Sequence, residues 1–476
     1  ALYSVVSILT GGFKALERCE KDGRIHHPWV LMSSDLRPLF SLRGKKYLKV
    51  LDLRSAHPTF WAKYICDISG LPEYLSLNED IKSRTGIEDA DVKIIPYNGY
   101  GDINIIRKLI KEEKIDAILH FTDPHYWQWL YDAEHEIRQL VPILYYHIWD
   151  NLPDPSYNRN YYESCDWLGC ISKLTYGIVN RVGKRSDKVT FKPLEDHQIS
   201  YVPHGINPDV FKPLDKVNDE YLKYINGNKE YDFILFYNNR NIRRKQTSDV
   251  IYSYRLFCDM LPKEQSDKCL LLMHTNPIDD SGTDLYAVVD ELCPNYDVKF
   301  TNNKFEQNVL NEFYNIVDCT INIASNEGFG LTTAESLMAG TPIITNVTGG
   351  LQDQCGFNYS ADDYVNFKTL HNKKVHGSTL HGEWVVPVWP SANNLNGSPI
   401  TPYIFDDRVN DGEVADAIAT VYSWSKEERK RRGLEGRQFA MENLSSEVMC
   451  NKMIEGIDKT LETFQPRKRF DLYKIV

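Results

Sequence analysis

Two carboxylates flank a glycine-rich turn that leads into a predicted helix. Glu327 lies in the turn, and Glu335 lies about two helical turns further along the chain. The apolar run 318–324 predicts a buried strand before the turn, and residues 331–339 and 341–346 predict the helix and the strand that follow. Such a helix start presents free backbone N–H groups, which favour a phosphate. Two acids beside a phosphate site are suited to accept hydrogen bonds from hydroxyls, so the segment predicts a nucleotide-sugar site.

A cluster of cations follows the predicted strand 233–237. Residues 240–245 contain three arginines and one lysine. Because ligands of open α/β sheets bind at the carboxyl ends of the strands, this loop is well placed to meet the same phosphates. Arg240 can bind a diphosphate through its planar fork and Lys245 as a point charge. The alternative is a basic loop that only contacts solvent.

The first half of the chain offers two further candidates. His147 ends the predicted strand 143–148, where it can face a cleft between domains and hydrogen-bond a sugar; the alternative is a histidine satisfied inside an aromatic core. Gly11 and Gly12 can let a backbone approach a ligand closely, and an ordinary turn is the alternative.

Other chemistries find little support in the sequence. Asp89-Ala90-Asp91 is the only DxD, and it precedes a predicted strand instead of following one, so a metal–diphosphate site is not expected there. The chain has no P-loop and no GxSxG, which removes the simplest kinase, ATPase and esterase interpretations. We therefore expect no metal ligands and no cofactor.

The chain of 476 residues is too long for a single core, and its strands alternate with helices as in doubly wound parallel sheets. We expect two such α/β domains at 1–212 and 213–445, joined by a charged linker at 212–230, with 446–476 packing back on the first. Residues 353–402, rich in Gly, Asn, Trp and Pro, predict an irregular insertion. Strands are predicted at 49–53, 92–96, 115–121, 143–148, 167–171, 233–237, 269–274, 298–300, 318–324 and 341–346. Helices are predicted at 58–68, 103–113, 127–140, 161–165, 173–182, 248–261, 285–293, 307–316, 331–339, 413–422, 426–442 and 445–464.

Charge and composition narrow the class of protein further. The net charge of −11 argues against a broad electrostatic grip on nucleic acid. The ten cysteines form no CxxC pair, which is typical of reduced thiols in a cytosolic protein. No apolar run is long enough to span a bilayer and no signal peptide is visible, so a cytoplasmic protein is expected, with a phage protein in a host cytoplasm as a variant of that expectation.

The combination resembles the retaining GT-B glycosyltransferases of the family 4 type. Glu327 to Glu335 (EGFGLTTAE) matches that family's acid-x7-acid motif, and Arg240 with Lys245 matches its R-x4-K clamp. The resemblance is carried further by residues 201–207, 340–344 and 348–350.

The resemblance implies two Rossmann-like domains facing a cleft and a role for each motif. Arg240 and Lys245 would neutralise the donor diphosphate, Glu327 would contact the donor sugar, and Glu335 would contact the ribose. His147 would match the cleft histidine. The turn would bind the donor through Gly328, Phe329, Gly330, Leu331 and Thr332. Transfer from a UDP- or GDP-linked sugar to a hydroxyl acceptor would retain the anomeric configuration without a divalent metal.

Two alternatives to this enzyme stay open at the level of sequence. One is a transferase that glycosylates modified DNA bases, as phage enzymes do; the cations at 240–245 and 467–469 favour it, and the net charge counts against it. The other is a non-catalytic binding subunit of the same fold, against which the complete acid pair argues.

Overall fold

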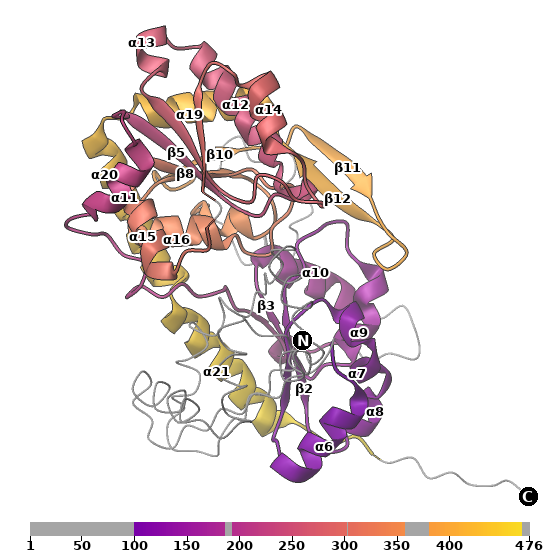
Figure 1. Ribbon diagram of the computed structural model, residues 1–476. Helices are drawn as coiled ribbons and strands as arrows, with labels where there is room; N and C mark the ends of the chain where they lie inside the picture. The colour runs from indigo at the N-terminus through magenta and orange to yellow at the C-terminus, as the bar shows by residue number, and fades with distance from the viewer. Residues whose placement is uncertain (1–99, 186–192, 302, 358–379, 469–476) are drawn as a thin grey trace, which may run out of the picture.

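The computed structural model describes residues 100–185, 193–301, 303–357 and 380–468. Within these residues the chain forms a four-stranded sheet, a six-stranded sheet and a separate two-stranded hairpin. Figure 1 shows the two sheets in two domains, each flanked by helices. Every strand pair of the two larger sheets is parallel, which confirms the predicted α/β fold class.

The sheet of the first domain has its described strands side by side in chain order. They are β1 (Ile118–His120), β2 (Ile143–His147), β3 (Trp167–Cys170) and β4 (Ile199–Tyr201). All residues of β2 and β3 are buried, as expected of parallel strands covered on both faces. The helical segments of this domain are α6 (Ile103–Glu113), η2 (Pro124–Trp127), α7 (Gln128–Asp132), α8 (Glu134–Ile137), η3 (Ser156–Asn158), α9 (Arg159–Glu163), α10 (Lys173–Gly183) and η4 (Asp196–Gln198).

The sheet of the second domain reverses its strand order at its centre. The spatial order is β10-β9-β8-β5-β6-β7, with β5 (Phe233–Asn238) beside β8 (Cys319–Asn322). The chain therefore builds one side of the sheet from β5 outward and then returns to build the other side from β8. The remaining strands are β6 (Cys269–His274), β7 (Asp297–Thr301), β9 (Ile343–Asn346) and β10 (Val385–Val388). Loops after β5 and β8 meet at this reversal, where open α/β sheets bind ligands.

Helices cover both faces of the second sheet (Figure 1). They are α11 (Asp219–Asn226), η5 (Arg243–Lys245), α12 (Thr247–Asp259), α13 (Lys263–Ser266), α14 (Leu285–Leu292), α15 (Gln307–Ile316), α16 (Leu331–Ala339), η6 (Gly349–Gln354), α19 (Asp411–Ser423) and α20 (Lys426–Asn443). The helix α16 ends at Gly340, whose φ of 87° is a left-handed conformation that suits glycine.

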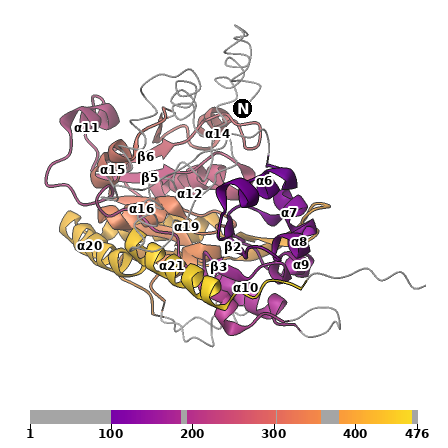
Figure 2. The ribbon, with the colours of Figure 1, turned by 90° about the horizontal axis from the view of Figure 1, so that it is seen from below.

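The last helix, α21 (Ser446–Thr463), crosses back to the first domain. Figure 2 shows it beside β3. The indole of Trp167 lies so close to Gly456 that a Cβ there would meet it at 2.2 Å. Beyond the helix, Arg467 donates from its backbone N–H to the carbonyl of Arg138 and pairs with Glu134 at 3.1 Å. The tail thus contacts the first domain as far as the structure describes it.

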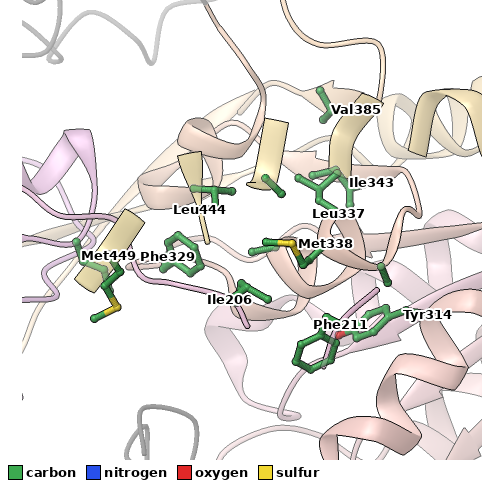
Figure 3. Packing of buried hydrophobic residues seen from close by; sticks show 14 of the residues in the cluster. Ile206, Phe211, Tyr314, Phe329, Leu337, Met338, Ile343, Val385, Leu444 and Met449 are labelled. Carbon is green, nitrogen blue, oxygen red and sulfur yellow. The ribbon is translucent and has the colours of Figure 1, made fainter. Parts of the chain in front are cut away.

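One hydrophobic cluster joins the two domains. Figure 3 shows Phe329, Leu444 and Met449 in this cluster, which also includes Trp167 of the first sheet and Phe236 of the second. Because residues from both domains share one buried cluster, separating them would expose apolar surface. The domains are therefore packed against each other as well as tethered.

Several predicted elements differ from the structure. The segment 127–140 is not one helix: Pro124 starts a 3₁₀ turn, and two short helices, α7 and α8, follow. The predicted linker contains the helix α11. The predicted insertion 353–402 contains β10 and part of a hairpin made by β11 (Ala392–Asn396) and β12 (Ile404–Arg408). The strands and helix predicted at 49–53, 58–68 and 92–96 lie outside the described residues.

Candidate functional site

The first acid of the motif, Glu327, lies in the turn between β8 and α16 and is buried. Its Oε1 accepts hydrogen bonds from Lys245 Nζ and, at 3.3 Å, from Asn322 Nδ2. Its Oε2 lies 3.6 Å from Arg244 Nη1. Burial raises the pKa of Glu327, but the charges of Lys245 and Arg244 outweigh this and lower the pKa below its ordinary value. Glu327 is therefore a buried, ionised carboxylate held between two cations.

The two predicted clamp residues point to different partners. Lys245 contacts Glu327, whereas Arg240 contacts Asp279 with its Nε at 2.9 Å and its Nη2 at 3.3 Å. Burial lowers the pKa of Lys245, and its contact with Glu327 opposes that effect. The structure thus brings Lys245, but not Arg240, to the acid turn.

Arg244 is the cation that sequence reasoning did not single out. Its Nη1 donates to the backbone carbonyl of Asn326 at 2.6 Å and lies 3.9 Å from Asp150 of the first domain. Its side chain is 40% exposed, and within the described part of the chain its Nε and Nη2 have no hydrogen-bond partner. A guanidinium with two unused donor atoms is suited to bind an oxyanion. The cluster at 240–245 was the only sequence signal for it.

Glycines allow a second loop to pack directly on the acid turn. A Cβ at Gly349, whose φ is 48°, would meet the carbonyl oxygen of Glu327 at 2.2 Å, and a Cβ at Gly350 would meet that of Gly328 at 2.2 Å. The N–H of Gly350 donates to Glu327 O at 2.7 Å. Gln354 adds hydrogen bonds to the carbonyls at 329 and 330. The loop over 348–354 therefore fixes the backbone of the turn.

The amino terminus of α16 carries the remaining turn residues. Gly330 caps the helix with a φ of 91°, and no side chain caps the first turn. Leu331 and Thr332 begin the helix, so their N–H groups are among those that a helix leaves without an internal partner. The side chain of Phe329 instead packs in the buried cluster that joins the domains, with its ring 5.5 Å from that of His204. The backbone N–H groups of Leu331 and Thr332 are therefore placed to meet a ligand, whereas the side chain of Phe329 is not.

The second acid, Glu335, lies on α16 beneath the turn and is buried. Its Oε2 accepts a hydrogen bond of 2.8 Å from the Tyr314 hydroxyl, which in turn accepts one of 3.0 Å from Asn238 at the end of β5. Its Oε1 has no hydrogen-bond partner within the described ranges. Burial raises the pKa of Glu335 to about 7, with the Tyr314 hydrogen bond opposing the change. Glu335 therefore changes protonation state near neutral pH.

His147 does not face the space between the domains. It is fully buried, with Nδ1 2.9 Å from the Tyr145 hydroxyl and Nε2 2.9 Å from the Tyr162 hydroxyl. Because the Tyr145 hydroxyl donates to the carbonyl of Thr122, Nδ1 donates to Tyr145 and Nε2 accepts from Tyr162. Burial lowers the pKa of His147 to about 3. His147 is therefore a histidine satisfied inside an aromatic core. The prediction that it faces the cleft and hydrogen-bonds a sugar is not what the structure shows.

The first domain contributes carboxylates to the site instead. Asp150 follows β2, and burial raises its pKa to about 6. Arg244 and Lys245 act in the opposite direction, while Asp123 and Glu327 raise the pKa of Asp150 further. Charges from both domains therefore act on one another at this point.

Gly11, Gly12, Asp89 and Asp91 lie outside the described residues. Among residues 100–185, 193–301, 303–357 and 380–468, no three His, Cys, Asp or Glu side chains are grouped to hold a metal ion. The eight cysteines of those residues are buried free thiols. None of the described helices has the length and apolar character needed to cross a membrane.

Comparisons with known proteins relate the chain to one family and to several solved structures. Residues 223–360 match the family described as glycosyl transferases group 1. No curated protein matches the sequence. Among solved structures, a glycosyltransferase from Rickettsia africae is similar over 88% of this chain and 100% of its own, with a TM-score of 0.57 and 15% identity.

Two further structures share the fold. Anabaena HepE, solved in complex with UDP-glucose, is 12% identical and has a TM-score of 0.54 over 80% of this chain and 89% of its own. Sucrose-phosphate synthase from Thermosynechococcus elongatus is 15% identical, with a TM-score of 0.51 over 75% of this chain and 77% of its own. The chain therefore has the two-domain GT-B fold of solved glycosyltransferases, and its residues 223–360 match the glycosyl transferases group 1 family.

Proposed function

We propose that the protein transfers a sugar from a UDP-linked donor to a hydroxyl acceptor with retention of the anomeric configuration. The observation that carries this proposal is the meeting of Glu327, Lys245 and Arg244 at the carboxyl ends of β5 and β8, beside the amino terminus of α16. The place is the reversal point of the sheet, and its cations and helix terminus suit a diphosphate.

The diphosphate is bound by backbone N–H groups at the start of α16 together with Lys245 and Arg244. Arg244 supplies Nε and Nη2, and Lys245 shares its charge between Glu327 and the phosphate. These cations stabilise the negative charge that grows on the diphosphate as the sugar–phosphate bond breaks, so the proposal needs no divalent metal for this task. Arg240 serves the same site indirectly, because its contact with Asp279 orders the loop that carries the other two cations.

The two acids bind hydroxyls on opposite sides of the diphosphate. Glu327 accepts a hydrogen bond from the donor sugar with the oxygen that faces Arg244, and Glu335 accepts one from the ribose with its Oε1. A hydroxyl that donates to ionised Glu335 would favour the charged carboxylate and lower its pKa from about 7. UDP is the preferred nucleotide in this proposal because HepE, which shares the fold, was solved with UDP-glucose.

Calorimetry with UDP, GDP and ADP tests the nucleotide, and release of UDP from UDP-sugars tests the reaction. We expect UDP to bind most tightly and UDP release to continue in EDTA. NMR of the anomeric proton in the first product formed should show the configuration of the donor. Glu327→Gln should lose UDP release, and Lys263→Ala, which changes a lysine that is 83% exposed on α13, should not. An inverted product, or strict dependence on a divalent metal, would contradict the proposal.

A further inference from the structure

The hairpin β11–β12 lies at the junction of the two domains. It follows β10 of the second sheet, and its two strands pair only with each other among the described strands. Figure 1 shows it extending from the second domain toward the first. Its β12 strand and the preceding Tyr403 contact both domains, and those contacts lie beside Asp150 and Glu327.

The first domain holds the hairpin through backbone and aromatic contacts. Phe405 donates its N–H to the carbonyl of Leu152 at 2.6 Å, and the Tyr157 hydroxyl donates to the carbonyl of Tyr403 at 3.0 Å. The rings of Tyr157 and Tyr403 meet edge to face at 4.9 Å. Ile404 and Phe405 pack against the buried core of the first domain. The start of β12 is therefore held by the first domain, although the hairpin follows a strand of the second sheet.

The second domain holds Asp407, two residues after Phe405 on the same strand. Asp407 accepts a hydrogen bond of 2.6 Å from Thr348 Oγ1, in the loop that packs on the acid turn. The carbonyl of Asp407 accepts from Gln246 Nε2 at 3.1 Å, and its N–H donates to the carbonyl of Ser325 at 3.3 Å. Asp407 is thus hydrogen-bonded to the residue that follows the basic loop 240–245, to the residue before the acid turn, and to the loop 348–354 that packs on that turn.

A single carbonyl joins these two sets of contacts. The carbonyl oxygen of Phe405 accepts one hydrogen bond of 3.0 Å from Asn151 of the first domain and one of 2.8 Å from Asn326 of the second. Asn151 directly follows Asp150, and Asn326 directly precedes Glu327. Displacing this carbonyl would therefore move the backbone beside a charged group of the site in each domain.

We propose that Asn151 and Asn326 are positioning residues that, through the Phe405 carbonyl of the hairpin, fix the Glu327 turn against the first domain. The inference rests on the proposed function, because it assigns the hairpin a task in sugar transfer. The proposal predicts that UDP binding and sugar transfer respond differently to changes in the hairpin. UDP contacts groups of the second domain alone, so its binding should not depend on the shared carbonyl, whereas transfer needs the acceptor side of the first domain in register with Glu327.

Asn151→Ala is the discriminating variant, because Asn151 belongs to the first domain and its side-chain amide donates to the hairpin carbonyl. Asn326→Ala removes the other hydrogen bond to the same carbonyl. The matched control is Asn394→Ala, an exposed residue of the same hairpin that lies opposite Asp406. For each variant we would measure kcat with a UDP-sugar, the Kd for UDP, and hydrogen–deuterium exchange of the peptide covering residues 403–407.

Asn151→Ala and Asn326→Ala should each lower kcat about tenfold, because loss of one hydrogen bond lets the two halves of the site shift. The Kd for UDP should stay within about twofold of wild type. Exchange of the peptide over 403–407 should become faster in both variants and stay unchanged in Asn394→Ala. The double variant should lose less than the product of the two single losses, since both act on one carbonyl.

Unchanged kcat in Asn151→Ala together with faster exchange over 403–407 would overturn the inference, because the hairpin would then loosen without affecting transfer. A rise in the Kd for UDP that matches the loss in kcat would also overturn it, because the hairpin would then support the donor site only in general. If wild type transfers no sugar from any nucleotide donor, the proposed function fails. The exchange measurement still reports whether the shared carbonyl fixes the hairpin, so the two failures are distinguishable.

Discussion

The carboxyl ends of the two sheets have opposite characters. In the second sheet, β5 and β8 end at the reversal of strand order, and Lys245 and Glu327 meet there as buried charges. In the first sheet the described strands follow one another in chain order, and β2 ends in His147, whose two ring nitrogens are occupied by tyrosine hydroxyls. The same position in a parallel sheet therefore carries a buried pair of charges in one domain and a closed core in the other.

The difference shows what a strand end needs in order to bind a ligand. A reversal of strand order separates the loops that follow two neighbouring strands, which leaves room between them. Where the described strands of the first sheet follow one another in chain order, the next helix covers a strand end, as Tyr162 of α9 covers His147. Chemistry in the first domain is therefore expected from loops beyond the strand ends, such as the one that carries Asp150.

Removal of the Lys245 charge should have the largest effect. Lys245→Ala deprives Glu327 of its nearest cation and, in the proposed function, removes one of the two cations that bind the donor diphosphate. We expect transfer to fall about 100- to 1,000-fold with the fold intact, as measured by UDP release and circular dichroism. Lys263→Ala on α13 is the control. Full activity in Lys245→Ala would show that the charges at the ends of β5 and β8 take no part in transfer.

Glu335 should make stability depend on pH. Its pKa of about 7 in the folded protein lies above the unfolded value of about 4.5, so the folded state binds the extra proton between these limits. Stability contributed by this residue is present at low pH and is lost as the pH rises through 7, by up to about 3 kcal/mol. Glu335→Gln should therefore gain stability relative to wild type as the pH rises from 5 to 8.

Thermal melting at several pH values, without ligand, measures this trend. Glu291→Gln, at an exposed position of α14, is the matched control and should follow wild type throughout. A melting difference between Glu335→Gln and wild type that does not change with pH would show that Glu335 keeps an ordinary pKa. The ligand-free acid pair would then consist of two ionised carboxylates.

Much of the second domain could be predicted because its elements depend on local pattern. The predicted bounds 269–274, 307–316 and 331–339 coincide with β6, α15 and α16, where apolar periodicity and glycine or strand ends set the limits. The strands β11 and β12 could not be predicted in this way. The strand β11 (Ala392–Asn396) is almost wholly exposed and has no alternation of apolar and polar residues, and the contacts that hold the hairpin come from distant segments of both domains.

The sequence likewise predicted one part of the candidate site, the acid turn with Lys245, and missed the part that depends on contacts between distant segments. The spacing of Glu327 and Glu335, and the cations before β6, located the acid turn and Lys245. Arg244 and Asp150 were not separable from their neighbours, because their contact joins segments that are 94 residues apart and belong to different domains. His147 was misplaced because a histidine at a strand end has the same local sequence whether tyrosines or solvent surround it.

His147 should matter for stability and not for transfer. His147→Phe leaves the Tyr162 hydroxyl without its buried acceptor, which should cost about 2 kcal/mol of folding free energy. The rate of UDP release per folded molecule should not change. Because the penalty comes from an unsatisfied hydroxyl, Tyr162→Phe in the same chain should recover part of the stability. Loss of transfer at unchanged melting temperature would instead place His147 in the reaction and weaken the contrast between the two sheets.

The contact between Asp150 and Arg244 should have the smallest effect, because it spans 3.9 Å and the guanidinium is 40% exposed. Asp150→Asn should lower the donor KM by no more than a few fold, since Arg244 no longer faces a competing carboxylate. With a pKa of about 6, Asp150 is neutral below that pH, so variant and wild type should coincide there and diverge above it. Donor KM measured from pH 5 to 8, with Asp116→Asn as an exposed control, tests this. A KM difference that persists at pH 5 would mean that Asp150 acts through its shape and not through its charge, and that the first domain contributes no electrostatic control to the charged strand end of the second.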